Sequence, residues 1–203
     1  MGANRVSSRA YVAAVLAALS LAVPSSAQTY RSDRRSNLTI DNFGRVNDNY
    51  YRGAQPQGSD YADLAALGVR TVIDLTSDDS EANEQRLVES AGMKSYRIPM
   101  TTHEPPTSAE VADFMKIVND PANQPVFVHC VGGRHRTGVM TAVYRMIQDN
   151  WTGDRAFKEM KQYNYGPDFL HSEFKKFVYA YSTQIDRSRK APLEAAVTTK
   201  TTS

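Results

Sequence analysis

Hydrophobic residues in the central part of the chain form short continuous runs separated by stretches with helical spacing. Residues 71–75 and 125–130 are compact apolar runs rich in β-branched residues, a pattern typical of strands buried on both faces. Residues 95–100 predict a further strand. Helical spacing of apolar residues is found over residues 61–67, 78–91, 107–118 and 137–150. Strands that alternate with helices predict an α/β fold, with a central, mostly parallel sheet of four to five strands flanked by helices.

The same pattern sets the expected limits of the domain. Residues 42–56 predict an edge strand or a hairpin that ends in a turn. Thr152 is expected to cap a helix, and a last helix carries apolar positions at Leu170, Phe174, Phe177, Val178 and Tyr181. We therefore predict a flexible lead-in over residues 28–37, one domain over residues 38–184, and a polar, disordered tail over residues 185–203.

The first residues have the pattern of a secretory signal peptide. Arg5 and Arg9 precede an apolar run over residues 10–23, and small residues follow as far as Ala27. Residues 1–27 are therefore expected to be cleaved, which predicts a periplasmic or secreted protein. The run is short for a membrane span, so no stable membrane insertion is expected after cleavage, although an uncleaved anchor is the alternative.

The net charge and the cysteine content are compatible with export. Loss of Arg5 and Arg9 with the signal peptide would bring the net charge from +2 to about zero, so no general basic field favours nucleic acid or anionic membranes. A single cysteine cannot form an internal disulfide in an oxidising compartment. One cysteine and four histidines without paired spacing predict no metal site. A monomer without a cofactor is expected.

The connection between the strand at residues 125–130 and the following helix carries the candidate chemistry. A loop at a helix N-terminus points backbone N–H groups at one place and adds partial positive charge, which suits a tetrahedral oxyanion. Cys130, the only cysteine, lies in this connection, and Arg136 follows it. A thiol in such a place is expected to be largely thiolate at neutral pH. Beneath a bound phosphate it would be an in-line nucleophile that forms a covalent thiophosphate.

Neighbouring residues have matching expected roles. Arg136 would hold two phosphate oxygens with its planar fork. Gly132 and Gly133 would let backbone N–H groups turn inward. The Thr137 hydroxyl would stabilise the sulfur as a leaving group, and His129 would orient the loop from behind. The remaining predicted substrate-binding residues are Val131, Arg134 and His135.

The string His129-Cys130-x5-Arg136-Thr137-Gly138 resembles the HCx5R(S/T)G signature of the cysteine-dependent protein-tyrosine and dual-specificity phosphatases. The alternative is a small buried cysteine in an ordinary strand-turn-helix connection. The resemblance extends over most of the chain and implies a phosphatase fold and a phosphorylated substrate. A Tyr-Arg-Gly-Ala-Gln-Pro string around Arg52 resembles the opening strand of dual-specificity phosphatases, where it lies beside the site; a surface salt bridge is the other interpretation of Arg52.

The sequence leaves two substrate classes open. The string from Gly133 to Gly138 is similar to that of the atypical plant and fungal dual-specificity phosphatases, which act on inositol pyrophosphates. Arg134 and His135 would suit a densely phosphorylated substrate, or would simply raise the positive potential for any phosphate, including that of a phosphoprotein.

The expected general acid is missing from its usual place. In the phosphatase family the loop at residues 101–107 usually carries an aspartate, and this sequence has none there. Glu104 is the best substitute and His103 the second, while no acid at all is also possible. An aryl ester, whose leaving group has a pKa of about 10, gains from an acid, whereas a pyrophosphate needs one less.

Two other classes of function remain. A sulfurtransferase of the rhodanese kind also uses a loop cysteine, although Thr137 favours phosphate. A phosphate-binding pseudophosphatase, which would bind oxyanions without turning them over, is the other class. It stays open because the sequence does not identify the general acid.

Overall fold

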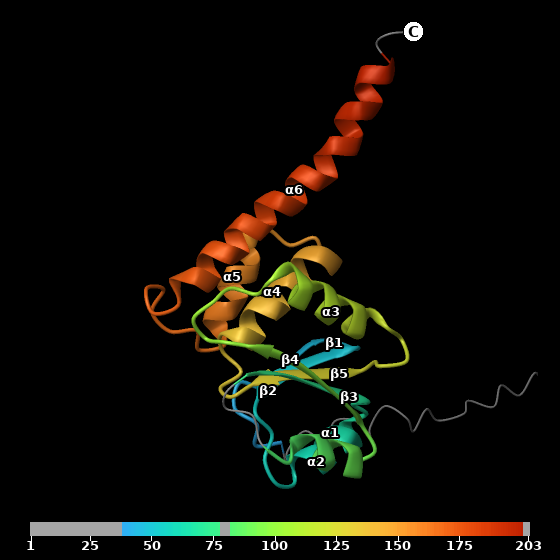
Figure 1. Cartoon of the computed structure of the whole chain (residues 1–203), viewed down its shortest axis with the longest axis vertical. Coiled ribbons are helices and arrows are strands. Elements are labelled where there is room, and N and C mark those ends of the chain that lie inside the picture. The colour runs from blue at the N-terminus through green and yellow to red at the C-terminus, as the bar shows by residue number, and fades with distance from the viewer. Residues whose placement is uncertain (1–37, 78–81, 201–203) are drawn as a thin grey trace, which may run out of the picture.

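The structure is a computed structural model that describes residues 38–77 and 82–200 (Figure 1). Its centre is a five-stranded sheet with the order β1-β2-β5-β3-β4. The strands are β1 (Gly44–Asn47), β2 (Tyr50–Ala54), β3 (Thr71–Thr76), β4 (Lys94–Met100) and β5 (Val126–Cys130). Only β1 and β2 pair in antiparallel fashion, and the other neighbours are parallel. The predicted α/β fold with a mostly parallel sheet is therefore confirmed.

Helices cover both faces of this sheet. One face carries α1 (Asp60–Leu67) and α2 (Glu84–Ser90), and the other carries α3 (Ser108–Asn119), α4 (Arg136–Gln148), α5 (Gly153–Gln162) and α6 (Ser172–Lys200) (Figure 1). Successive side chains of a strand point to opposite faces. In β5, accordingly, Phe127 packs into the cluster under α1 and α2, while Val126 and Val128 pack into the larger cluster on the other side. β5 is therefore buried on both faces, as its apolar run predicts.

Local signals in the sequence explain several helix ends. Gly68 closes α1 in the left-handed conformation, with a φ of 96°. Thr107 and Glu110 form the predicted capping box of α3, and the Thr152 side chain accepts the N–H of Arg155 at the start of α5.

Three predicted boundaries differ from the structure. α2 begins at Glu84, after a turn at residues 82–83, and not at residue 78; residues 78–81 lie outside the described part. Leu170 is not a core position of the last helix, because α6 begins at Ser172 and Leu170 is 59% exposed. The turn before α6 is fixed by Asp168, which pairs with Lys161 and Lys175. The structure also continues α6 to Lys200, where the sequence predicted a disordered tail.

The hairpin prediction for residues 42–56 is refined in one respect. β1 is the edge strand, whereas β2 lies between β1 and β5 and is buried along its whole length. The predicted signal peptide and lead-in lie outside the described residues. Within residues 38–77 and 82–200, no helix has the length and hydrophobicity that a membrane crossing requires.

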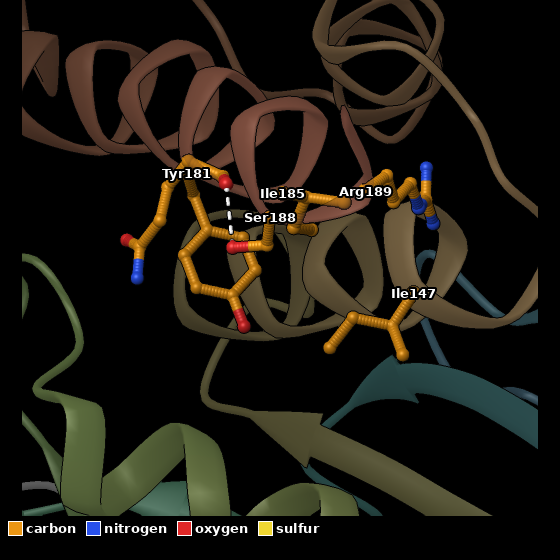
Figure 2. A pocket seen from close by; sticks show the side chains of 6 residues that line it. Ile147, Tyr181, Ile185, Ser188 and Arg189 are labelled. Atoms are coloured by element: carbon orange, nitrogen blue, oxygen red, sulfur yellow. Dashed lines mark hydrogen bonds between the residues drawn. The ribbon is translucent and has the colours of Figure 1, made fainter. Parts of the chain in front are cut away.

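One cavity, of about 350 Å³, lies where α6 crosses the C-terminal end of α4 (Figure 2). Ile147 lines it from α4, and Tyr181, Ile185 and Arg189 line it from α6. Because an α-helix rises about 1.5 Å per residue, Ile147 lies roughly 16 Å along α4 from Arg136. The cavity therefore contains none of the predicted site residues.

Candidate active site

The strand β5, the turn at residues 131–135 and the first turn of α4 bring the predicted catalytic residues together. Cys130 is the last residue of β5 and is 3% exposed. Arg136 and Thr137 open α4 and are also buried. The prediction that a strand, a glycine turn and a helix enclose Cys130 is thus confirmed in its geometry, and we name residues 130–137 the phosphate loop.

Gly133 is the residue on which the shape of the phosphate loop depends. Its φ is +64°, a left-handed conformation that glycine adopts without strain. A Cβ atom at this position would lie 2.4 Å from the backbone carbon of Gly53 and 2.6 Å from the backbone nitrogen of Ala54. The phosphate loop therefore rests directly on the backbone of β2, and only glycine fits there.

Carbonyl groups of the phosphate loop are held by donors from the N-terminal hairpin. The backbone N–H of Gln55 donates to the Val131 carbonyl over 3.1 Å. The Asn42 side chain donates to the Gly132 carbonyl over 2.7 Å, and the Arg52 guanidinium donates to the Gly133 carbonyl over 2.7 Å.

The orientation of the loop N–H groups follows from these hydrogen bonds. In a planar trans peptide the C=O and the following N–H point in opposite directions. The N–H groups of residues 132–134 consequently point away from the hairpin. No backbone acceptor is found for the N–H groups of residues 132–135 among the described residues. Such a row of N–H groups at a helix N-terminus is an anion-binding site.

Arg136 and Thr137 differ in how they are held. The Arg136 Nη1 donates to the carbonyl of Met100, at the end of β4, over 3.1 Å, which anchors the guanidinium next to the loop at residues 101–107. The Thr137 hydroxyl is buried and has no hydrogen-bond partner among the described residues. A buried hydroxyl normally bonds to something. The expected role of Thr137, a hydrogen bond to the sulfur or to a phosphate oxygen, would satisfy it.

His129 lies behind the phosphate loop, fully buried in β5, and contacts a carboxylate that the sequence did not single out. Its Nε2 lies 3.0 Å from Oε1 of Glu84. Tyr61 and Gln55 also donate to this oxygen, over 3.1 and 2.8 Å. Burial alone would raise the pKa of Glu84, but hydrogen bonds and the nearby His129 ring lower it below its ordinary value.

The sequence gives no signal for a role of Glu84 at the site, because this residue opens a short helix in a run of polar residues. Only the parallel pairing of β5 with its neighbours brings that helix beneath His129.

Asp74, Glu84 and His129 could also be read as ligands of a metal ion. One ligand atom from each lies within 4.8 Å of the others. The Oδ1 atom of Asp74, however, already accepts hydrogen bonds from the backbone and side chain of Thr76. The Glu84 Oε1 atom accepts the bonds described above, whereas Glu84 Oε2 and both ring nitrogens of His129 are buried and meet no hydrogen-bond partner among the described residues. The three side chains therefore form a buried polar cluster behind the phosphate loop, joined to it by the contact between Glu84 and His129.

The loop at residues 101–107, which we name the acid loop, is much less constrained. His103 and Glu104 are both exposed. Glu104 takes part in none of the hydrogen bonds or ion pairs found among the described residues. The structure therefore does not bring Glu104 into contact with Cys130, and its role as general acid stays a prediction.

Arg134 and His135 have different surroundings although they are adjacent. Arg134 is exposed, whereas His135 is partly buried and its Nε2 lies 2.9 Å from the carbonyl of Tyr165. The His135 ring also lies 3.7 Å, centroid to centroid, from the ring of His171. His171 in turn lies 3.2 Å from the carbonyl of Thr102 in the acid loop. His135 thus connects the two loops, and His171 is part of that connection.

Comparisons with known proteins agree with this geometry. A protein-family model described as "PTP-NADK: DSP-PTPase phosphatase fused to NAD+ Kinase" matches residues 26–178. The chain is 30% identical over 155 residues to the probable tyrosine-protein phosphatase DG1060 of Dictyostelium discoideum, which covers 74% of this chain and 92% of that protein. It is 28% identical over 125 residues to the inositol diphosphatase DSP3 of Arabidopsis thaliana, which covers 60% of this chain and 61% of the plant protein.

A solved structure has the same fold. The core catalytic domain of the PP-IP phosphatase SIW14 from S. cerevisiae superimposes with a TM-score of 0.62 at 23% identity, and the match covers 76% of this chain and 94% of that domain.

Proposed function

The chain belongs to the DSP-PTPase phosphatase family, as its motif predicts, and from this premise we propose that it hydrolyses phosphate monoesters through a thiophosphate intermediate on Cys130. The observation that carries the proposal is that one short turn joins Cys130 to Arg136 and Thr137. The backbone N–H groups of residues 132–135 in this turn have no backbone acceptor among the described residues. That arrangement combines a nucleophile, a cationic clamp and an anion cradle.

The reaction takes place in two displacements. The Cys130 thiolate attacks phosphorus, the bond from phosphorus to the ester oxygen breaks, and the leaving oxygen takes up a proton. A water molecule then attacks phosphorus, the phosphorus–sulfur bond breaks, and inorganic phosphate leaves. Arg136 and the loop N–H groups hold the phosphoryl oxygens in both steps. The Thr137 hydroxyl donates to the departing sulfur in the second step.

We propose an aryl ester of the phosphotyrosine type as the substrate, with Glu104 as the proton donor. The likeness to a protein named a probable tyrosine-protein phosphatase supports this class. A phenol leaving group, with a pKa of about 10, gains from protonation as it departs, and Glu104 is the carboxylic acid that the acid loop offers. Its exposure leaves it able to approach a bound substrate.

A second candidate is an inositol polyphosphate or pyrophosphate. The observation that favours it is the acid loop itself, which has no aspartate and leaves Glu104 without contacts. A pyrophosphate has a better leaving group and can dispense with the acid. The exposed Arg134 beside the site would suit a substrate with several phosphates, and one relative is named an inositol diphosphatase.

The pH–rate profile of the mature chain on an aryl phosphate separates the two candidates, measured for wild type, Glu104→Gln and Asp113→Asn. Asp113 is exposed on α3 and serves as the matched control for loss of a carboxylate near the acid loop. If Glu104 is the acid, kcat falls by about 10²- to 10⁴-fold in Glu104→Gln alone. The decline of kcat at high pH, which is expected for wild type, should then be absent from the profile of this variant. An unchanged profile together with turnover of an inositol pyrophosphate would favour the second candidate. No turnover of either substrate would contradict the proposed function.

We also propose that the chain is exported and that residues 1–27 are removed. The basic head, short apolar run and small residues of that segment support this proposal. Expression in a host with a secretory pathway, followed by intact-mass measurement, should give a chain that begins at Gln28 in the periplasm or medium. A full-length chain in the membrane fraction would contradict cleavage.

A further inference from the structure

Arg52 is a buried cation whose surroundings do not explain why a charge is kept there. Its side chain, on β2, is fully buried. The Nη2 atom donates to the Gly133 carbonyl, but Nε and Nη1 have no hydrogen-bond partner among the described residues. Nor does any carboxylate in the described part of the chain pair with it. The interpretation of Arg52 as a surface salt bridge is therefore wrong.

Burial of an unpaired charge opposes folding. A guanidinium removed from water without a carboxylate partner loses several kcal/mol of hydration, of the order found for buried ions in general. This desolvation lowers the pKa of Arg52 below its ordinary value. The ring of Tyr163, 3.9 Å from the guanidinium carbon, returns part of the lost stabilisation through a cation–π contact. Some further function must account for the rest.

The position of Arg52 suggests that function. β2 pairs in parallel with β5, so that Arg52 lies opposite Val128 and Ala54 lies opposite Cys130. The side chain reaches forward from there to the Gly133 carbonyl, on the side of the phosphate loop opposite to the loop's N–H groups. The guanidinium consequently lies behind the anion site, where its charge acts on the thiolate and on a bound phosphate through the protein interior and not through water.

We propose that Arg52 is a positioning residue of the phosphate loop. It holds the Gly133 carbonyl so that the next N–H, that of Arg134, faces the anion, and it supplies a buried positive charge that is compensated when Cys130 is a thiolate or phosphate is bound. Its presence therefore weakens the empty fold and strengthens the anion-bound fold. The proposal rests on the proposed function, because it requires that the phosphate loop bind a phosphate.

Three variants separate the charge of Arg52 from its hydrogen bond. Arg52→Met removes both in a side chain of similar length. Arg52→Lys keeps the charge and one donor. Asn42→Gly removes the neighbouring donor to the Gly132 carbonyl without any change of charge, and glycine tolerates the φ of +53° found at Asn42.

Each variant is compared with wild type in three measurements. These are kcat and KM on an aryl phosphate, the pH dependence of Cys130 alkylation by iodoacetamide, and the melting temperature with and without inorganic phosphate. For Arg52→Met we expect kcat to fall on the order of 100-fold, as for a misplaced catalytic geometry. The midpoint of alkylation should move to higher pH, and the stabilisation by phosphate should be lost.

The decisive measurement is the direction in which the melting temperature without phosphate changes. It should equal or exceed that of wild type in Arg52→Met, because replacement of a buried charge by an apolar side chain is often neutral or stabilising. Arg52→Lys should keep the wild-type alkylation midpoint. Asn42→Gly should lower kcat by about 10-fold, as expected for one misdirected hydrogen bond, with the midpoint unchanged.

Wild-type kinetics or a wild-type alkylation midpoint in Arg52→Met would overturn the proposal. So would a lower melting temperature with activity that falls only in proportion to the folded fraction, since Arg52 would then be purely structural. If Arg52→Met does not fold, a shifted midpoint in Arg52→Lys overturns the proposal and an unshifted one supports it. A wild-type chain that turns over no phosphate ester would refute the proposed function, whereas the alkylation and phosphate-binding measurements would still decide the role of Arg52.

Discussion

The phosphate loop and the acid loop lie at the same edge of the sheet, but they are held in opposite ways. Three carbonyls of the phosphate loop accept hydrogen bonds from the N-terminal hairpin, and Gly133 rests on the backbone of β2. In the acid loop, His103 and Glu104 are exposed, and the loop is linked to His171 through the Thr102 carbonyl; the adjoining contact with Arg136 is made by the carbonyl of Met100 at the end of β4.

The difference shows which part of the chemistry is built into the fold. The nucleophile and the phosphate clamp need positions accurate to a fraction of an ångström, and rigid strands and helices provide them. A proton donor must match the leaving group, which differs between substrates. In the proposed mechanism the phosphate loop therefore determines the reaction, and we expect the acid loop to distinguish substrates.

The strongest test of the phosphate loop is Cys130→Ser. A serine hydroxyl has almost the same volume but is not ionised at neutral pH, so we expect loss of all measurable turnover. Inorganic phosphate should still raise the melting temperature, because the N–H groups and Arg136 remain. The measurement is kcat on an aryl phosphate beside thermal unfolding with and without phosphate; full activity in Cys130→Ser would contradict the mechanism.

The next largest effect is expected for Gly133→Ala, with Gly132→Ala as its control for stability. A Cβ at Gly133 meets the backbone of β2 at 2.4 Å and imposes a strained φ, so we expect a loss of about 3 kcal/mol or more in the free energy of unfolding. At Gly132 the nearest atom would be a flexible part of Arg134, 3.5 Å away. Urea unfolding should give a much smaller loss there, and equal losses in the two variants would mean that the phosphate loop is not held against β2.

Thr137→Val should have a smaller effect that is confined to the second chemical step. The unpaired hydroxyl is replaced by a methyl of the same shape, so the loss of one hydrogen bond to a charged group should slow hydrolysis of the intermediate roughly 10- to 100-fold. Rapid-mixing kinetics on an aryl phosphate should then show a burst of leaving group. Thr141→Val is the control, because that hydroxyl donates to the Thr137 carbonyl and should affect stability without producing a burst. A burst in both variants would contradict the role of Thr137.

The two loops also differ in how far they could be predicted from the sequence. The phosphate loop follows from local patterns, since a β-branched run, a glycine pair and a helical period adjoin one another between residues 125 and 150. Arg52 is placed beside the site only by the resemblance of its strand to a known family, with a surface salt bridge as the alternative. Glu84 and His171 could not be placed from local patterns at all, because they reach the site only through parallel pairing and helix packing.

The smallest predicted effect concerns His135, which links the phosphate loop to the acid loop. Burial lowers the pKa of His135, the hydrogen bond to the Tyr165 carbonyl opposes this, and the charges of His171, Arg134 and Arg136 lower it further. The unfolded chain therefore binds a proton at this histidine from about pH 6.5, while the folded chain stays neutral to a lower pH. Well above pH 6.5 His135 contributes nothing to the pH dependence of stability, and between pH 6.5 and the lower pKa of the folded chain each step toward acid favours the unfolded chain.

His135→Gln keeps a side-chain donor for the Tyr165 carbonyl but cannot titrate. Urea unfolding at pH 7.5 and at pH 5.5 should therefore show a steeper loss of stability in wild type than in His135→Gln, with the difference confined to the acid side. Glu173, which lies 3.5 Å from His171, is present in both proteins, so its titration cancels in the comparison. Equal slopes would contradict this prediction and would show that the packing of His135 against His171 does not exclude the proton.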